Sequence, residues 1–385
     1  MIQAVAVEHL SEGLFIIELE SPQGRMRVTQ SGRVSSRKLI DKIKANGIET
    51  VWVDFERSDL SHYVPGFNKH NPKPSKTTSL EVELKSAESI LLKSKDLLNK
   101  AINNLYQGRN IDITPIADLS ESIVNSIRCN PDAIQCVAAL RQKDAYLLEH
   151  SLNVAFLMVS FGRHLGLDLQ VLKQLAIGGL LHDVGKTQVN LEVLNKPARL
   201  TTEEFEHMKL HQVLSEPVLD SIPGLSEMSR QVSLLHHEKL DGSGYPKGLA
   251  GDEISLVGRM SAIVDIYDAL TATRCYKKSI SPTAAFKILK SMTPHQLDSN
   301  LLYEFIRNVG VYPVGSLVEL SDGRAGLVWE SNETSFLKPI IKCFYSVKLG
   351  HYIEVDMVNL SESQGLTIER GLSSRKGNID PTFYR

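Results

Sequence analysis

The sequence predicts a mainly α-helical protein, in which an all-helical bundle follows a small α+β module and precedes a short β appendage. Apolar residues recur at helical spacing from about residue 111 to residue 309. Strand-like runs dominate only before residue 60 and after residue 310. A proline-rich segment separates the first of these regions from the helices, so a domain boundary is expected there.

Residues 1–64 are predicted to form the α+β module. Strand composition marks residues 13–19 and 50–54, and either Ser35 or Ser36 can cap a helix between them. No histidine-aspartate cluster or glycine loop occurs in this module. Chemistry is therefore expected elsewhere in the chain, and the module is a candidate for contacts with signalling proteins.

A linker and a heptad pattern come next. Residues 65–79 carry three prolines and few apolar side chains, as a linker does, and residues 80–130 are predicted to be connecting helices. The first of these helices has a seam with spacings of four and three: Leu80, Leu84, Ala87, Leu91, Ser94, Leu98, Ala101 and Leu105. Two interpretations stay open. Either the helix 80–105 forms a parallel homodimer that couples the module to the rest, or it packs on its own domain.

Residues 131–309 are predicted to be the main helical domain. Its clearest helices have one apolar face each and cover residues 144–165, 170–181, 202–219, 254–273 and 282–292. Thr201 or Thr202 is expected to cap the third of them. Residues 310–385 are predicted to be a β appendage and tail, with strand-like runs at residues 312–320, 325–329 and 339–345 and a loosely ordered end from Ser373.

Composition excludes several classes of protein. The hydrophobic fraction of 42% and the charged fraction of 23% are ordinary for a soluble globular protein. A net charge of −2 gives no basic surface for DNA. Four cysteines without a CxxC pair argue against a disulfide framework and favour the cytoplasm. The chain begins without the pattern of a signal peptide, and its longest strongly apolar stretch, residues 154–161, is too short for a membrane span.

Histidines and aspartates gather at the ends of apolar helices between residues 150 and 265. The seven candidate metal ligands are His150, His182, Asp183, His211, His236, His237 and Asp265. Imidazole and carboxylate together suit Fe, Mn, Zn or Ni better than Mg or Ca. Asp183 is the natural bridge between two ions, and such a pair can activate water against a phosphodiester. A single buried histidine is more often a core residue, and His164, His207 and His295 are interpreted in that way.

Three segments together resemble a known family. They are LLHDVGK at residues 180–186, HHEKLDGSGYP at residues 236–246 and DIYDALTATRCYKK at residues 265–278. In this order and spacing they resemble the HD-GYP domain, a subgroup of the HD superfamily of metal-dependent phosphohydrolases, over about residues 131–308. The bundle is accordingly expected to have the HD-type fold. Residues 1–64 also resemble the small domain of unknown role that often precedes HD-GYP domains.

The resemblance implies metal-dependent hydrolysis of cyclic di-GMP to the linear dinucleotide, with a further step to GMP left open, in bacterial second-messenger signalling. It implies two divalent transition-metal ions, Fe or Mn before Zn or Ni, held by the seven candidates. Asp183 and Lys186 are the implied catalytic residues. The implied substrate-binding residues are Lys186, Gly244, Tyr245, Pro246, Arg274 and Lys277. Asp268, on the same helix face as Asp265, is expected to orient a ligand histidine or a water.

The chain departs from the family at four positions. Some members hold a third metal with a glutamate four residues before the first histidine, where this chain has Tyr146, so two ions are expected. Cys275 replaces a usual proline. Gln212 and Ser215 follow His211 where many members have proline and glycine, which predicts a slightly different turn with the ligand intact.

Two other functions are compatible with the same residues. The helical domain could be a non-catalytic receptor for cyclic di-GMP, but such a receptor is expected to have lost a ligand, and none is lost here. The enzyme could also hydrolyse another cyclic dinucleotide, because the Gly-Tyr-Pro turn alone does not select the base.

Overall fold

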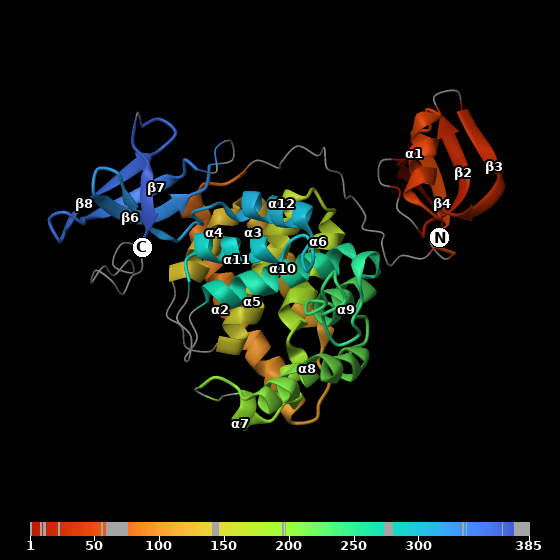
Figure 1. Ribbon diagram of the computed structural model, residues 1–385, viewed down its shortest axis with the longest axis horizontal. Helices are drawn as coiled ribbons and strands as arrows, with labels where there is room; N and C mark the ends of the chain where they lie inside the picture. The colour runs from red at the N-terminus through yellow and green to blue at the C-terminus, as the bar shows by residue number, and fades with distance from the viewer. Residues whose placement is uncertain are drawn as a thin grey trace. The chain divides into compact units, whose positions relative to one another are not determined.

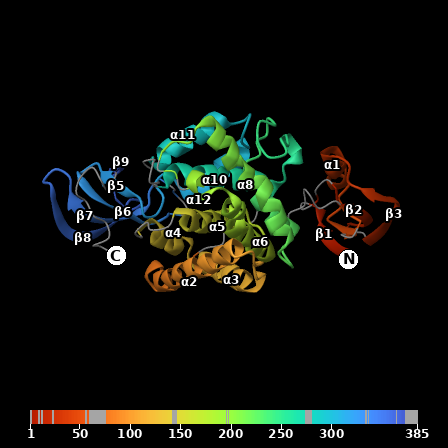
Figure 2. The ribbon, with the colours of Figure 1, turned by 90° about the horizontal axis from the view of Figure 1, so that it is seen from below.

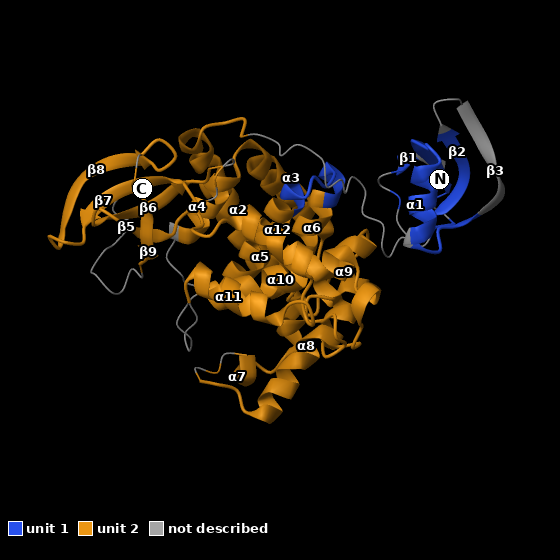
Figure 3. Ribbon diagram, turned by 45° about the horizontal axis from the view of Figure 1, so that its top comes forward, with its two compact units in different colours: residues 1–73, 162–171 blue, residues 74–161, 172–385 orange. Residues whose placement is uncertain are grey.

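A computed structural model gives the fold of the chain. It describes residues 2–372 except for residues 8–9, 11–12, 22–23, 55–56, 59–75, 141–145, 195, 197, 273–279, 333–334, 336 and 364. The chain divides into two compact units, one of residues 1–73 and 162–171 and one of residues 74–161 and 172–385 (Figure 3). Most of the predicted linker and the whole predicted tail lie outside the described residues.

The first unit contains a four-stranded antiparallel sheet in the order β1-β4-β2-β3. Its elements are β1 (Ile2–Ala6), β2 (Phe15–Ser21), β3 (Gly24–Arg33), α1 (Arg37–Ala45) and β4 (Thr50–Asp54). Alternate residues of β4, Val51 and Val53, are fully buried and pack with Ile40 of α1 in one apolar core. The predicted strands correspond to β2 and β4, and the predicted helix corresponds to α1, whereas β1 and β3 lie outside the predicted strands.

The second unit is built on helices, which confirms the mainly α fold class (Figure 1). They are α2 (Leu80–Tyr106), α3 (Ile113–Cys129), α4 (Pro131–Leu140), α5 (Tyr146–His164), α6 (Leu169–Leu181), α7 (Leu191–Leu194), α8 (Thr202–Asp220), α9 (Glu227–Leu234), α10 (Leu256–Thr271), α11 (Pro282–Met292) and α12 (Ser299–Val309). Two short 3₁₀ turns, η2 (Val184–Gln188) and η3 (Gly251–Glu253), interrupt them. The five predicted helices of the main domain match α5, α6, α8, α10 and α11 to within three residues at each end.

Local chemistry fixes the start of α8, which carries part of the site. The Thr201 hydroxyl accepts from the backbone N–H of Glu204 at 3.2 Å, and the Glu204 carboxylate accepts from the backbone N–H of Thr201 at 2.7 Å. This reciprocal pair satisfies donors that would otherwise be orphaned at the helix start. The predicted capping residue is therefore confirmed as Thr201.

An aromatic cluster fixes α10 against its neighbours. The ring of Tyr267, in α10, stacks on Phe286 of α11 at 5.1 Å and meets Phe305 of α12 edge-on at 5.2 Å. Phe305 also contacts Phe161 of α5 at 5.2 Å. All four rings are buried. Because Tyr267 lies between Asp265 and Asp268, this packing also sets how α10 presents its two carboxylates.

The heptad seam of α2 is buried inside the chain. Figure 2 shows α2 and α3 side by side below α5, and α2 packs against both α3 and α4. Leu80, Ala87, Leu91 and Leu98 of the seam are buried, and the polar member Ser94 donates to the Ile90 carbonyl at 2.6 Å. The seam therefore has partners within the domain, which supports the second interpretation, and the homodimer through the helix 80–105 stays a prediction. A repeat of seven residues is also what an ordinary amphipathic helix shows over a few turns.

A five-stranded antiparallel sheet follows the helices, in the order β8-β7-β6-β5-β9. Its strands are β5 (Leu317–Leu320), β6 (Arg324–Glu330), β7 (Ile340–Ser346), β8 (His351–Asn359) and β9 (Ile368–Gly371). The predicted runs correspond to β5, β6 and β7. The buried carboxylate of Asp132, in α4, ties this sheet to the helices, since it accepts from Lys76 at 2.7 Å and from the backbone N–H of Ser331 at 2.8 Å.

Among the described residues, no helix combines the length and the apolar character that crossing a bilayer requires.

Candidate metal centre

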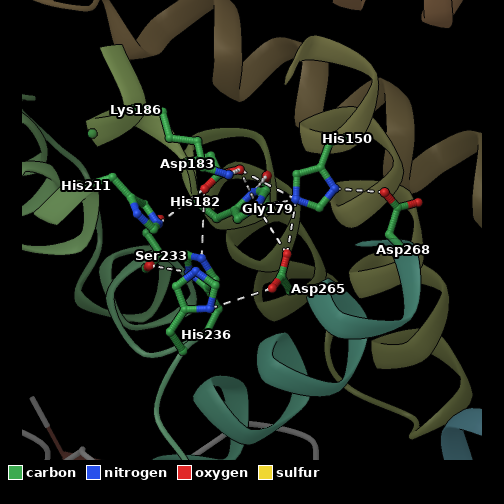
Figure 4. Close-up of polar contacts among 12 residues, drawn as sticks. His150, Gly179, His182, Asp183, Lys186, His211, Ser233, His236, Asp265 and Asp268 are labelled. Atoms are coloured by element: carbon green, nitrogen blue, oxygen red, sulfur yellow. Dashed lines mark hydrogen bonds and ion pairs between the residues drawn. The ribbon is translucent and has the colours of Figure 1, made fainter. Parts of the chain in front are cut away.

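All seven predicted ligands meet in one buried region of the helical unit. His150 comes from α5, His182 and Asp183 follow the end of α6, and His211 lies in the middle of α8 (Figure 4). His236 and His237 follow the end of α9, and Asp265 lies in α10. Because α6 ends at Leu181, the His-Asp pair stands in a turn, where the two side chains can face the same point.

The first group consists of His150, His182 and Asp265, with Asp183 shared. The Nε2 atom of His150 lies 3.0 Å from Asp265 Oδ1 and 3.1 Å from His182 Nε2. Asp183 Oδ2 lies 3.5 Å from His150 Nε2 and 3.3 Å from His182 Nε2. Four potential ligand atoms thus surround one small volume, and all four residues are buried.

The second group consists of His211, His236 and His237, again with Asp183 shared. One ring nitrogen of each histidine lies within 4.8 Å of those of the other two. Asp183 Oδ1 lies 3.6 Å from His211 Nε2 and 3.9 Å from His236 Nε2. Asp183 therefore turns one oxygen to each group, so it could contribute a ligand atom to a cation held by either group.

Three of the histidines are oriented by the same local device. His182, His211 and His236 each direct Nδ1 to the backbone carbonyl three residues earlier, with distances of 2.9, 2.6 and 2.7 Å. A proton on Nδ1 makes that bond and leaves the Nε2 lone pair for the centre of the cluster. The carbonyls belong to Gly179, Met208 and Ser233.

A carboxylate orients the fourth ring. Asp268 Oδ2 lies 2.8 Å from His150 Nδ1, and its other oxygen accepts from the side chain of Asn153 at 3.0 Å. The predicted contact of Asp268 with a candidate ligand is present in the structure. A carboxylate behind an imidazole fixes the tautomer and makes the inward nitrogen more basic.

The protonation states fit metal binding with one exception. Burial lowers the pKa values of His211, His236 and His237, which keeps these rings neutral, and the value for His237 falls to about 3. Burial alone would raise the pKa of Asp183, but the charge of Lys186 and the contact with His182 outweigh it and hold the pKa of the carboxyl well below its usual range. His150 is the exception and is treated next.

Burial alone would lower the pKa of His150 as well. Hydrogen bonds with Asp265 and Asp268 outweigh it and raise the pKa to about 9. Asp265 is affected in the opposite sense, since its hydrogen bond with His150 outweighs burial and holds the pKa of the carboxyl well below its usual range.

Two buried atoms test whether a cation fits. Asp183 Oδ1 has no hydrogen-bond partner among the described residues, although it is enclosed by imidazoles. A buried ionised oxygen without a partner is costly unless a cation compensates it. The side-chain oxygen of Gln212 is likewise buried without a hydrogen-bond partner. The donor set, five imidazoles and two carboxylates, suits transition metals.

Two glycines allow the backbone to close around the cluster. A Cβ on Gly185 would stand 2.0 Å from the carbonyl oxygen of His211, so η2 and α8 touch only because this residue has no side chain. The backbone N–H of Gly185 also donates to the Ser215 hydroxyl at 3.0 Å. A Cβ on Gly244 would stand 2.5 Å from the Cα of Glu238. Because Gly244 has no side chain, the Gly-Tyr-Pro turn can pack against the backbone that directly follows His236 and His237.

Two of the predicted substrate residues contact the cluster, Tyr245 beside the second group and Lys186 beside Asp183. The ring of Tyr245 lies 4.6 Å from the ring of His237, and Lys209 Nζ lies 5.6 Å from the Tyr245 ring. Lys186 Nζ lies 2.5 Å from Asp183 Oδ2. Lys186 stands in η2, so it is held against the bridging carboxylate by a tight turn.

Several predictions fall outside these groups. Arg274, Lys277 and Cys275 lie outside the described residues, as does the side chain of Tyr146. His164, His207 and His295 belong to none of the ligand groups found in the described part of the chain. Their interpretation as core residues is wrong, because His207 and His295 are exposed and His164 is only half-buried.

Sequence reasoning missed how close two residues of α8 come to the cluster. The predicted turn after His211 is wrong, because Gln212 and Ser215 continue α8 and are both fully buried. Gln212 reaches the imidazoles themselves, and Ser215 holds η2. Their only signal in the sequence is that they differ from the family pattern. Lys209 was also missed, since one lysine on a charged helix face has no distinguishing pattern.

Comparison with known proteins gives concordant matches. Residues 135–301 match the HD domain family, and residues 2–116 match a domain of unknown function, DUF3391. A cyclic di-GMP phosphodiesterase of Pseudomonas aeruginosa is 32% identical over 339 residues, which is 86% of this chain and 81% of that protein. A 3'3'-cGAMP-specific phosphodiesterase of Vibrio cholerae is 35% identical over 46% of this chain and 41% of that protein.

A solved structure has a similar chain course. It is an HDG"Y"P protein from Bdellovibrio bacteriovorus, with 15% identity and a TM-score of 0.49 over 79% of this chain and 98% of that one.

Proposed function

This chain belongs to the HD-GYP family of cyclic dinucleotide phosphodiesterases, and on that premise we propose that its buried cluster hydrolyses cyclic di-GMP to the linear dinucleotide in the bacterial cytoplasm. Support for the substrate comes from the Pseudomonas relative, which bears that name and aligns over most of both chains. Whether a second cleavage to GMP follows is a matter for product analysis in the same experiment.

The observation that carries the proposal is the position of Asp183. One of its oxygens faces His150 and His182, and the other faces the second group. We assign the seven predicted residues as ligands of two divalent ions, with Fe or Mn preferred to Zn or Ni. Bound there, such ions would lower the pKa of a water molecule and offset the negative charge that develops at the phosphorus.

Lys186 is assigned to the phosphate and to the bridging carboxylate. Its ammonium donates one hydrogen to Asp183 Oδ2, at 2.5 Å, and has two more donors available for a phosphate oxygen. The side chain is 17% exposed, so it reaches from the buried cluster towards solvent. An ammonium held there would stabilise charge on the non-bridging oxygens during attack.

Tyr245 and Lys209 are assigned to the nucleotide. Tyr245 stacks on His237 with an interplanar angle of 32°. Its partly buried ring and the nearby lysine form an aromatic and cationic edge beside the second group. A guanine can stack on such a ring while the lysine faces phosphate. Gly244 and Pro246 shape the turn, and Arg274 and Lys277 are proposed to contact the second phosphate region.

The decisive experiment compares turnover by the wild type and by Asp183→Ala. Purified chain loaded with Mn²⁺ or Fe²⁺ is incubated with cyclic di-GMP, and products are separated by chromatography. Because the bridge serves both ions, the variant should lose about 10³-fold or more in rate. Asp252→Ala is the matched control, since that carboxylate is 99% exposed, and it should keep full activity. Equal turnover by the wild type and Asp183→Ala would refute the proposal.

A second candidate substrate is a mixed cyclic dinucleotide. Its support is the Vibrio relative, which is named for 3'3'-cGAMP. The same assay with equal concentrations of cyclic di-GMP, 3'3'-cGAMP and cyclic di-AMP separates these substrates. We propose that cyclic di-GMP has the highest kcat/KM. The first unit is left to contacts with signalling proteins, since its described residues contribute to none of the ligand groups.

A further inference from the structure

The side chain of Gln212 lies inside the second group, although it is not among the seven predicted ligands. It projects from α8 next to His211 and is completely buried. Its terminal Nε2 atom lies 3.2 Å from His211 Nε2 and 3.0 Å from His236 Nε2. No other glutamine or asparagine of the described residues has a hydrogen bond to these two rings.

The hydrogen bonds around Gln212 are incomplete as they stand. Both histidines use Nδ1 for a backbone carbonyl, which leaves Nε2 of each free to bind a cation. The amide nitrogen lies beside the His236 ring, 3.0 Å from Nε2 and 3.2 Å from Nδ1, and so stands next to both Nε2 atoms. Meanwhile Oε1 is buried without a hydrogen-bond partner. A half turn about the terminal bond exchanges the oxygen and nitrogen with almost no change in shape.

The spacing is that of atoms that share one ion. Two donors bound at right angles with bonds of about 2.1 Å lie about 3 Å from each other. The terminal amide atom of Gln212 has this separation from His211 Nε2 and from His236 Nε2, at 3.2 and 3.0 Å. With the oxygen in that place, the orphaned acceptor would lie within about 3 Å of two imidazole nitrogens that are predicted to hold the same ion.

We propose that Gln212 is a further metal ligand, which binds through Oε1 the ion held by His211, His236 and His237. This inference rests on the proposed metal centre and adds a neutral oxygen donor to its second ion. An amide oxygen raises the coordination number of an ion that already has three imidazoles and the Asp183 bridge. Higher coordination with an oxygen donor favours Mn or Fe over tetrahedral Zn.

Two substitutions separate a ligand from a hydrogen-bond donor. Gln212→Leu keeps the approximate size and removes both polar atoms, whereas Gln212→Glu keeps a ligand oxygen and removes the amide N–H. Gln174→Leu is the matched control, because Gln174 also has hydrogen bonds within the helical unit, to Ser226 and Ser229, but lies in no ligand group. Thermal unfolding of the chelator-treated proteins checks that each variant folds without metal.

The readouts are metal content, Mn²⁺ affinity and the visible spectrum of Co²⁺-loaded full-length protein. Gln212→Leu should weaken the affinity of the protein for one of two Mn²⁺ ions by about 10-fold or more. Even residues that only hydrogen-bond to metal ligands change metal affinity by about 10–100-fold. The Co²⁺ absorption of Gln212→Leu should become more intense, because coordination number falls. Gln212→Glu should bind Mn²⁺ at least as tightly as the wild type does, and Gln174→Leu should match the wild type in affinity and spectrum.

Each other result overturns the inference. If Gln212→Leu keeps the wild-type affinity and Co²⁺ spectrum, the amide is only a packing group. If Gln212→Glu weakens binding as much as Gln212→Leu does, the amide acts as a donor through Nε2. With either of these two variant results, a wild type that binds two ions and hydrolyses cyclic di-GMP leaves the proposed function standing while this inference fails. A wild type that binds no ion overturns both.

Discussion

The two ligand groups that meet at Asp183 differ in charge. The first joins His150 and His182 to a second carboxylate, Asp265, whereas the second is made of three imidazoles. Burial lowers the pKa values of all three rings of the second group, that of His237 to about 3, so these imidazoles are neutral at pH 7. In the first group, hydrogen bonds with Asp265 and Asp268 outweigh burial and raise the pKa of His150 to about 9.

This difference means that the two ions should not be equivalent. A cation that enters the first group must displace the proton of His150, but it gains a negative partner in Asp265. A cation that enters the second group meets neutral rings that need no deprotonation, and it depends on Asp183 for charge. We therefore expect different affinities for the two ions, with loss of Asp183 affecting both.

The largest expected effect comes from removing one ligand on either side. Asp265→Asn should lose the first ion and His237→Ala the second, so each variant should hold about one ion where a binuclear site holds two. Each should lose about 10³-fold in turnover, because attack needs both ions. Metal analysis together with the cyclic di-GMP assay checks this. Full activity with one ion in either variant would contradict the binuclear centre.

A double substitution sharpens the same comparison. Residues that act as one unit show effects that are far from additive. Asp265→Asn combined with His237→Ala should therefore be only slightly less active, within about 10-fold, than the weaker single variant. Rates are measured with substrate in excess over KM for all three variants. A loss equal to the product of the two single losses would show that the groups work independently.

The convergence of the seven ligands could be predicted from the sequence, because they stand at the ends of apolar helices that had to share a core. Their pairing with particular oxygens of Asp183 could not. Adjacent residues of a helix point about 100° apart, so a continuous helix through His182 and Asp183 would turn the two side chains in different directions. The helix in fact ends at Leu181, and a turn releases both side chains.

Two other features could not be predicted from the sequence, for similar physical reasons. The α2 seam has a heptad spacing, but the spacing of apolar residues does not say whether the buried face meets a second chain or α3 and α4. Gln212 could not be placed in the site from its position beside His211. Only the three-dimensional approach of α9 and η2 to α8 shows that two successive residues of that helix are both enclosed.

A smaller effect is expected behind the first group. Asp268→Asn keeps the size of the side chain but removes the charge that His150 Nδ1 faces at 2.8 Å. It should weaken the affinity for one ion by about 10–100-fold and leave the affinity for the other unchanged. Residues that hydrogen-bond to metal ligands change metal affinity by this amount. Titration with Mn²⁺ by calorimetry resolves the two sites. Equal weakening at both sites would show that the groups are not separable.

The smallest effect is expected at Ser215, which supports the second group only through the backbone. Its hydroxyl accepts from the Gly185 N–H at 3.0 Å in a fully buried place. Ser215→Ala leaves that N–H unsatisfied, so the free energy of unfolding of the metal-free protein should fall by about 1–3 kcal/mol. Urea unfolding measures the change.

The exposed helix serine Ser122, whose hydroxyl bonds the Asp118 carbonyl, gives the matched control. Ser122→Ala should change the free energy of unfolding by less than about 0.5 kcal/mol. Once loaded, Ser215→Ala should still bind two ions, because every atom that faces the cations is unchanged and only the fit of η2 on α8 is loosened. Loss of the second ion in Ser215→Ala would instead mean that the position of η2, and with it of Asp183, is set by this single hydrogen bond.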